Sequence, residues 1–147
     1  MDRIAVLNFI REHSLAVEAS VSTQGRPQAA IVGFVVSDDF EIFFDSVVAT
    51  RKVGNLRHNP LIAMVIGGHI PGDERSVQFE GIVDEPIGFE LRRLKSLYFK
   101  RFPDGREREH WPGIAYFRAK PVWIRYSDYN QSPALVEVFH FPGGDLP

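Results

Sequence analysis

The sequence predicts a mainly β fold of the α+β class, a small antiparallel barrel of six or seven short strands with helices at its corners. Between residues 15 and 45, three apolar stretches are separated by turn-forming residues, a pattern typical of an antiparallel meander. The chain also holds 12 Phe, 2 Trp and 4 Tyr, rigid side chains that suit a β-rich core or a surface that receives a flat ligand or a partner subunit. Its length and the absence of repeats and linkers predict one domain over residues 1–147, with a tail from about residue 130.

The first third of the chain is predicted to begin with a helix and continue as strands. Residues 2–12 form the helix, because Ile4, Leu7 and Ile10 recur at helical spacing and Asp2 can cap it. Strands are expected over residues 15–22, 28–36 and 41–45, with turns at 23–27 and 37–39.

The rest of the chain alternates helices and strands. Thr50 is a good N-cap for a helix over residues 51–58, and the apolar run 61–66 predicts a strand buried on both faces. Pro86 starts a further helix, and Pro121 suggests an edge or a bulge inside a strand over 114–126. The remaining expected segments are a polar loop at 67–75, a strand at 76–83, a helix break at 102–105, a short strand at 136–141 and a frayed tail at 142–144.

Composition excludes several classes of function. With no cysteine, the chain has no disulfide, thiolate nucleophile or cysteine-ligated metal. A formal net charge of -2 argues against nucleic-acid binding by bulk charge, and no apolar run is long enough to cross a membrane. The start of the chain lacks the layout of a secretion signal, so a cytoplasmic protein is expected. Phosphate-loop, dinucleotide and hydrolase-elbow motifs are absent, and the five histidines are too dispersed to predict a metal site.

One local pattern indicates anion binding. Arg51 and Lys52 stand in the first turn of the helix that follows the strand 41–45. Cations there oppose the helix dipole, but an anion bound to the free N–H groups would reverse that balance. The alternative is that both are solvated surface residues, which is also the interpretation of the mixed charge run 100–109.

Four motifs in order give the sequence a family resemblance. They are Thr23-x-Gly25-x-Pro27, then Asp45…Thr50-Arg51-Lys52-x-x-Asn55-Leu56-x-x-Asn59-Pro60, then Val77-Gln78-Phe79-Glu80-Gly81, and finally Pro121-Val122-Trp123-Ile124-Arg125-Tyr126-Ser127. Over roughly residues 3–129, this resembles the FMN-binding split-barrel proteins related to pyridoxamine 5′-phosphate oxidase. The resemblance implies a six-stranded split barrel and a homodimer with two FMN sites in clefts between the subunits.

The resemblance also implies which residues bind the cofactor. Gln28, Ala29, Ala30, Ile31 and Val32 would run along the flavin ring, and Phe44, Asp45 and Ser46 would lie near the ring and ribityl chain. Thr50, Arg51 and Lys52 would hold the phosphate, and Gln78, Trp123 and Arg125 would approach from the other subunit. A structural role is the alternative for four of them: Thr50 as a helix cap, Gln78 on a solvent face, Trp123 in packing and Arg125 as an ion-pair partner of Glu80 or Asp128.

The function that the resemblance implies is an FMN-dependent oxidoreductase that transfers hydride through the flavin, with NADH or NADPH as a possible electron donor. The chain lacks the Arg/His-bearing C-terminal segment with which the oxidases grip their substrate, so the substrate stays open. The alternatives are a non-catalytic flavin or haem carrier or sensor, a deazaflavin-dependent reductase, and a barrel that only mediates interactions. Phe34, Phe43, Phe44, Phe79 and Phe117 are candidates for covering a partner subunit, with filling the barrel interior as the alternative.

Overall fold

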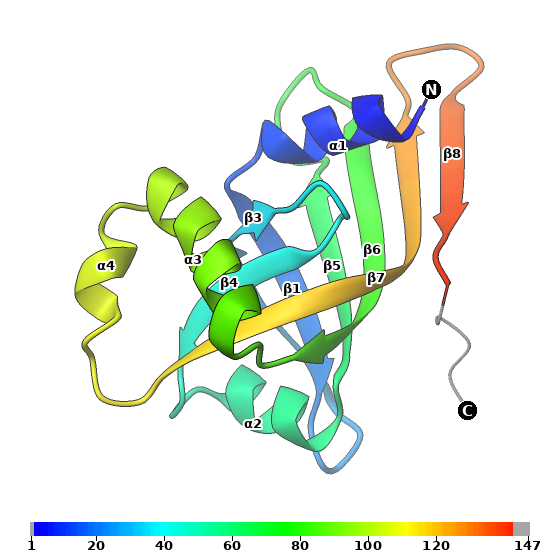
Figure 1. The fold of residues 1–147 in the computed structure, drawn as a ribbon. Coiled ribbons are helices and arrows are strands. Elements are labelled where there is room, and N and C mark those ends of the chain that lie inside the picture. Colours follow the sequence, from blue (N-terminus) through cyan, green and yellow to red (C-terminus); the bar gives the residue numbers. More distant parts are fainter. Residues whose placement is uncertain (1, 143–147) are drawn as a thin grey trace.

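This computed structural model describes residues 2–142, which contain eight strands and four helices (Figure 1). The helices are α1 (Arg3–Arg11), α2 (Arg51–His58), α3 (Gly88–Arg101) and α4 (Gly105–Arg108). The strands are β1 (Leu15–Val21), β2 (Pro27–Gly33), β3 (Val35–Val36), β4 (Ile42–Val47), β5 (Leu61–Gly67), β6 (Arg75–Asp84), β7 (Ile114–Asp128) and β8 (Leu135–His140). Asp2 caps α1 as predicted, since its carboxylate accepts a hydrogen bond from the N–H of Ala5 at 2.9 Å.

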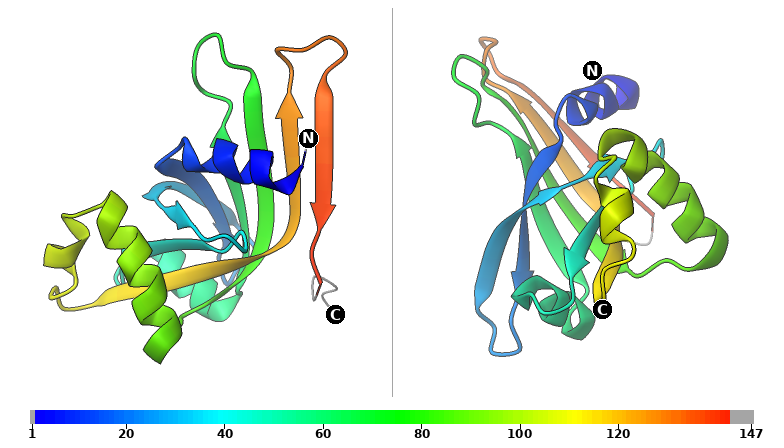
Figure 2. Two further views of the ribbon diagram at one scale, coloured as in Figure 1. Left: turned by 45° about the horizontal axis from the view of Figure 1, so that its top comes forward. Right: turned by 90° about the vertical axis from the view of Figure 1, so that its left-hand side faces the viewer.

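All strands belong to one antiparallel sheet in the order β2-β1-β5-β6-β7-β4-β3, with β8 added on β7. The 15-residue β7 bridges the two halves, because its first part pairs with β4 while its later part lies between β6 and β8. The sheet curls into a half-barrel, with α1, α2 and α3 placed around it (Figure 2). This confirms the mainly β fold.

The six strands implied by the resemblance are too few, because one predicted strand is two and the strand predicted at 136–141 joins the sheet as β8. The stretch 28–36 breaks at Phe34, whose N–H donates to the carbonyl of Ser14 at 3.0 Å. Before the break β2 pairs with β1, and after it β3 pairs with β4. The helix α4 lies inside the run predicted to be only a solvated charged face, and residues 143–144 of the predicted tail lie outside the described residues.

Two further expectations concern individual strands. Pro121 does mark a bulge, because Glu80 pairs with Trp123 and Gly81 with Pro121, so that Val122 is skipped. The strand 61–66 is not buried on both faces. In β5, burial alternates, and one side of the strand is solvent-exposed.

The hydrophobic core has two parts on opposite sides of the sheet. The larger fills the barrel between α1, α2 and the strands, and the smaller lies between α3 and the β4–β7 pair. The five phenylalanines considered for a partner contact are at most 1% exposed: Phe34, Phe43, Phe44, Phe79 and Phe117. They fill the interior of this chain, so the idea that they cover a partner is wrong.

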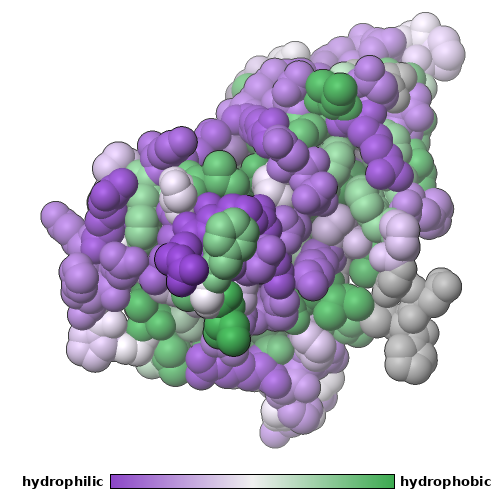
Figure 3. Space-filling model, viewed as in Figure 1, coloured by the Kyte–Doolittle hydropathy of each residue, from purple (hydrophilic) through white to green (hydrophobic). Residues whose placement is uncertain are grey.

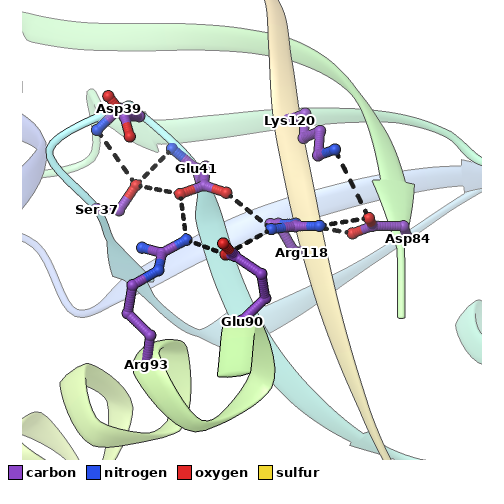
Figure 4. Close-up of polar contacts among 8 residues, drawn as sticks. All are labelled: Ser37, Asp39, Glu41, Asp84, Glu90, Arg93, Arg118 and Lys120. Carbon is purple, nitrogen blue, oxygen red and sulfur yellow. Dashed lines mark hydrogen bonds and ion pairs between the residues drawn. The ribbon is translucent and has the colours of Figure 1, made fainter. Parts of the chain in front are cut away.

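The start of α3 is fixed to the sheet by a charge network centred on Arg118 of β7 (Figure 4). The Arg118 guanidinium donates to Asp84 at 2.6 and 2.9 Å, to Glu41 at 3.2 Å and to Glu90 at 3.1 Å. Arg93 binds Glu41 and Glu90 in turn. Because these residues come from the loop before β4, from β6 and β7 and from α3, the network fixes α3 relative to the sheet.

On the surface shown in Figure 3, hydrophobic residues lie as separate patches among hydrophilic side chains. The most exposed hydrophobic residues of α3 and its approach are Ile87 (82%) and Phe89 (69%). Among the described residues, no helix has the length and apolar character needed to cross a membrane.

Candidate functional site

A cavity of about 230 Å³ lies where the N-terminus of α2 faces β1 and β2. It is lined by Glu18 and Ser20 of β1, by Gln28, Ala29 and Ala30 of β2, and by Thr50, Arg51 and Lys52 at the start of α2. Six of the predicted site residues, from two segments that are 20 residues apart in the sequence, therefore surround one hollow: Gln28, Ala29, Ala30, Thr50, Arg51 and Lys52.

The helix start at this cavity has no side-chain cap. Thr50 occupies the N-cap position with extended backbone (φ -75°, ψ 153°), yet its side chain forms no capping hydrogen bond. Its hydroxyl instead donates to the carbonyl of Val47 at 2.8 Å and lies 3.0 Å from the hydroxyl of Ser46. The predicted capping role of the Thr50 side chain is therefore wrong. Since the first turn also holds no acidic residue, its N–H groups and the cations Arg51 and Lys52 are available to an anion.

Asn55 connects α2 to the opposite wall of the cavity. Its side chain is buried, and its amide nitrogen donates to the Ser20 hydroxyl at 3.1 Å and to the Gln28 side-chain oxygen at 2.9 Å. The contact fixes the distance between the helix start and β1–β2, and it orients the Gln28 amide. In the sequence, Asn55 belongs to the motif that begins at Asp45 and has no predicted role; a polar residue one turn after Arg51 was the available signal.

Glu18 is a site residue that sequence reasoning missed. It lies in the middle of β1, is only 1% exposed and faces the same cavity as Lys52. Burial raises the pKa of its carboxyl, while the charge of Lys52 and a hydrogen bond with Ser20 oppose that rise. Its Oε2 atom has no hydrogen-bond partner among the described residues. The alternation of β1 concealed it, because Glu18 and Ser20 share the polar side of the strand, and in the structure that side is buried while Leu15 and Val17 on the apolar side are exposed.

Three residues at the end of β4 that were predicted to contact the cofactor do not line the cavity. The Phe44 side chain is buried in the barrel core. The Asp45 carboxylate points to the other side of the sheet, where it accepts hydrogen bonds from the Tyr98 hydroxyl at 3.0 Å and from Arg108 at 2.9 Å. Neither side chain lines the cavity, and Ser46 reaches it only through its hydrogen bond with Thr50.

The outward side of the sheet carries the remaining predicted residues. Strand register places two rows across β2, β1, β5, β6, β7 and β8 on this side, which we call the outer face. One row is Ile31, Val17, Val65, Gln78, Arg125 and Val138, and the next is Ala29, Ala19, Ala63, Glu80, Trp123 and His140. Gln78 and Arg125 are therefore direct neighbours, and Trp123 lies beside them.

The outer face is apolar for a surface exposed to solvent. Ile31, Val65 and Val17 are 69%, 46% and 41% exposed. Gln78 and Trp123 line a shallow hollow of about 120 Å³ on this face, separate from the cavity at α2. Arg125 forms no ion pair with Glu80 or Asp128 in the described part of the chain, and its Nε atom is buried without a hydrogen-bond partner there. Val32, on the opposite side of β2 from Ile31, is buried in the core.

The predicted residues of β2 and those of β6 and β7 are too far apart to contact the same part of a ligand within one chain. From β2 to β6 there are three strand spacings, about 14 Å in total. Searching residues 2–142 for a cluster of three or more metal-binding side chains finds none.

Comparisons with known proteins place this chain in a family. The family model described as pyridoxamine 5′-phosphate oxidase matches residues 3–128. The match covers most of the chain, which therefore belongs to the pyridoxamine 5′-phosphate oxidase-like family, as the sequence resemblance indicated. No curated protein matches the chain.

Solved structures with this fold include proteins described as binding two different cofactors. The heme binding protein from Mycobacterium smegmatis has a TM-score of 0.79 at 15% identity, over 95% of this chain and 60% of that one. HutZ, a heme storage protein from Vibrio cholerae, has a TM-score of 0.70 at 18% identity, over 81% and 89%. A pyridoxamine 5′-phosphate oxidase-related, FMN-binding protein from Nostoc punctiforme has a TM-score of 0.71 at 14% identity, over 96% and 91%. At these identities the similarity shows the shared fold, and this chain spans about 60% of the mycobacterial protein's length.

Proposed function

We propose that this protein is an FMN-binding oxidoreductase, with the FMN phosphate held in the cavity at the start of α2. The observation that carries the proposal is the uncapped helix start with Arg51 and Lys52 facing β1 and β2 across a cavity. A phosphate would accept hydrogen bonds from the first-turn N–H groups and charge-assisted ones from both cations, and it would compete with the Val47 carbonyl for the single proton of the Thr50 hydroxyl. The absence of side chains beyond Cβ at Ala29 and Ala30 leaves room for a ligand at β2.

The chemistry would come from the cofactor, and the chain would bind and orient it. When bound, the isoalloxazine ring supplies the group that accepts or donates hydride. The chain itself would position the cofactor and surround it with suitable charges. This agrees with its lack of cysteine and of a recognised catalytic triad. NADH or NADPH is the proposed electron donor, and the proposal leaves the substrate open.

A homodimer would complete the site. Gln78 on β6 lies about 14 Å from β2 in the same chain, and Trp123 and Arg125 on β7 lie one strand further away, so all three would reach a flavin on β2 only from a second copy. The exposed apolar rows of the outer face support such a copy, because large apolar surfaces favour association. The unpartnered Nε of Arg125 would then find an acceptor in the partner or its ligand.

The test is the absorbance spectrum and native mass of the purified full-length chain. We expect flavin bands and the mass of FMN in a dimer, and loss of both bands and cofactor mass in the double variant Arg51→Ala, Lys52→Ala. The control is Arg92→Ala, Lys100→Ala, which removes the same two charges from exposed positions on α3. A colourless wild-type protein that ignores added FMN in a fluorescence titration would contradict the proposal.

The same sample separates an enzyme from a carrier. Rapid loss of the flavin absorbance on mixing with NADH or NADPH, followed by recovery with an electron acceptor, supports an oxidoreductase. Bound flavin that neither nucleotide reduces supports a flavin carrier or sensor instead. The cofactor mass also distinguishes FMN from a deazaflavin.

Haem binding is a second candidate, favoured by one feature of this chain. His140 of β8 lies opposite Trp123 on the outer face, so an imidazole stands beside the proposed ligand cleft. The relatives described as heme-binding and heme storage proteins support this alternative. A Soret band on adding haemin, lost in His140→Ala and retained in His110→Ala, would favour haem over FMN.

A further inference from the structure

Glu18 is a buried carboxyl group that forms no direct ion pair in the described part of the chain. Its side chain is 1% exposed and faces the cavity at the start of α2. Among residues 2–142 it forms a hydrogen bond with Ser20 but no ion pair, and its Oε2 atom has no hydrogen-bond partner. Buried acceptors are normally satisfied, so this atom marks a position where the cavity lacks a polar group.

The charged groups around Glu18 all come from one element. Lys52 and Arg51 of α2 line the same cavity, and Lys52 acts on the carboxyl electrostatically. On the strands beside it, Glu18 pairs with Ala30 of β2 and Met64 of β5, which carry no charge. The other lining residues, Ser20, Gln28, Ala29 and Thr50, do not titrate in the neutral range.

A phosphate in this cavity would lie close to that carboxyl. A volume of about 230 Å³ corresponds to a sphere about 8 Å across, so a phosphate at Arg51 and Lys52 would lie within a few ångströms of Glu18. Two negative charges at that separation in a buried site repel strongly, and the phosphate would also compete for the compensating charge of Lys52. Protonation of Glu18 removes the repulsion and turns its free oxygen into a hydrogen-bond donor.

The geometry points to a proton-coupled phosphate site, in which Glu18 takes up one proton when a phosphate monoester enters the cavity and donates its O–H to a phosphate oxygen. The inference rests on the proposed function, because it takes the FMN phosphate as the ligand. Burial already raises the pKa of Glu18 in the free protein, so protonating its carboxyl costs less free energy than protonating an exposed one. The site would hold phosphate-bearing ligands more tightly as the pH falls.

The experiment is isothermal titration calorimetry of the full-length chain with FMN at pH 7, 8 and 9. A phosphate monoester is already mainly dianionic in this range, so its own titration contributes little. Each titration is run in two buffers of different protonation enthalpy, which gives the number of protons taken up. Riboflavin, which lacks the phosphate, is the second ligand. The variants are Glu18→Gln and, as a matched control in an exposed loop, Glu74→Gln.

We expect uptake approaching one proton per FMN in the wild type and in Glu74→Gln, with Kd rising up to tenfold per pH unit. Glu18→Gln keeps the shape of the side chain, and FMN should bind it with no proton uptake and a Kd that is flat with pH. Riboflavin should bind weakly and take up no proton. FMN binding to the wild type without proton uptake overturns this inference and leaves the proposed function standing. No FMN binding at any pH overturns the proposed function itself, and with it the phosphate ligand assumed here.

Discussion

Asn55 shows how one buried side chain can hold the proposed site in shape. Its two hydrogen bonds, to Ser20 and Gln28, are the polar contacts that join α2 to β1 and β2. If Asn55 becomes Ala, Ser20 and Gln28 each lose a buried donor. Each such group left without a partner costs about 1–3 kcal/mol.

We therefore expect Asn55→Ala to lower the free energy of unfolding by about 2 kcal/mol. We also expect it to weaken FMN binding, because the distance across the cavity is no longer fixed. Urea denaturation and an FMN titration measure the two effects. Asn8→Ala, on the exposed side of α1, is the control and should change neither. Equal effects of both variants would show that Asn55 has no special structural role.

Two glycines provide a second test at the scale of single residues. A Cβ added at Gly81 would lie 2.5 Å from the carbonyl oxygen of Lys120 and 2.7 Å from the Phe79 ring. Gly81 stands at the bulge between β6 and β7, where the two backbones approach closely. A Cβ at Gly54 in α2 would meet nothing within 4 Å.

The two Gly→Ala variants should therefore change stability in opposite directions. Gly81→Ala should destabilise the fold by about 1–3 kcal/mol or more, because backbone must move. Gly54→Ala should stabilise it by about 0.5–1 kcal/mol, since alanine favours a helix interior. Chemical denaturation measures both. If Gly81→Ala leaves the free energy of unfolding unchanged, the strands at the bulge are free to separate.

Residue types in the sequence predicted the cationic half of the site but not its acidic wall. Arg51 and Lys52 stand out because they oppose a helix dipole, and the structure does place them at a cavity. Glu18 and Asn55 become meaningful only when β1 and α2 are known to face each other. The prediction that Asp45 lies near the flavin also failed because it depends on distant contacts: its partners Tyr98 and Arg108 follow more than 50 residues later.

At the scale of elements, the docking of α3 depends on ionised carboxylates. Glu90 belongs to the network around Arg118, and the hydrogen bond from Arg93 lowers the pKa of its carboxyl below the ordinary 4.5. A carboxyl whose pKa is lower in the folded state stabilises that state above its unfolded pKa. The stabilisation is lost as the pH falls through the folded value.

We expect the free energy of unfolding to fall slightly between pH 7 and 6, because burial lowers the pKa of His13, and to fall more steeply below about pH 5, as carboxylates of this kind become protonated. In Glu90→Gln, stability at pH 7 should be lower and the fall with acid less steep. Some acid sensitivity should remain, because the pKa values of Asp73 and Asp128 are lowered as well. Denaturation curves at each pH test this, and an unchanged slope in Glu90→Gln would exclude Glu90 as a contributor.

Most elements could be read from local patterns, and the exceptions have a physical cause. Hydrophobic spacing and capping predicted α1 and α2, and the turn residues predicted the strands up to β4. The break at Phe34 depends on which neighbour each half pairs with, which a continuous apolar run does not reveal. The alternation of β5 was hidden because its exposed positions, Leu61, Ala63 and Val65, are apolar too.

For the whole molecule, that hidden alternation is the main argument for association. Apolar residues placed on a solvent-facing side of a sheet raise the free energy of the isolated chain, unless another surface covers them. The rows of the outer face combine this apolar surface with Gln78, Arg125 and Trp123. A second copy covering this face would place those side chains at the β2 strand of its partner and complete two equivalent sites.

The variant that tests this is Val65→Asp, which puts a charge in the middle of the outer face without disturbing the core of its own chain, since Val65 is 46% exposed. We expect light scattering to give twice 16.7 kDa for the wild type and 16.7 kDa for the variant. The variant should also release FMN while keeping its far-UV circular dichroism. Ile87→Asp, at an even more exposed apolar position before α3, is the matched control and should remain a dimer with its flavin. If Val65→Asp stays dimeric, or becomes monomeric and still binds FMN as tightly, the ligand site is not shared between copies of this chain. Gln78 and Trp123 would then have only a structural role on their strands.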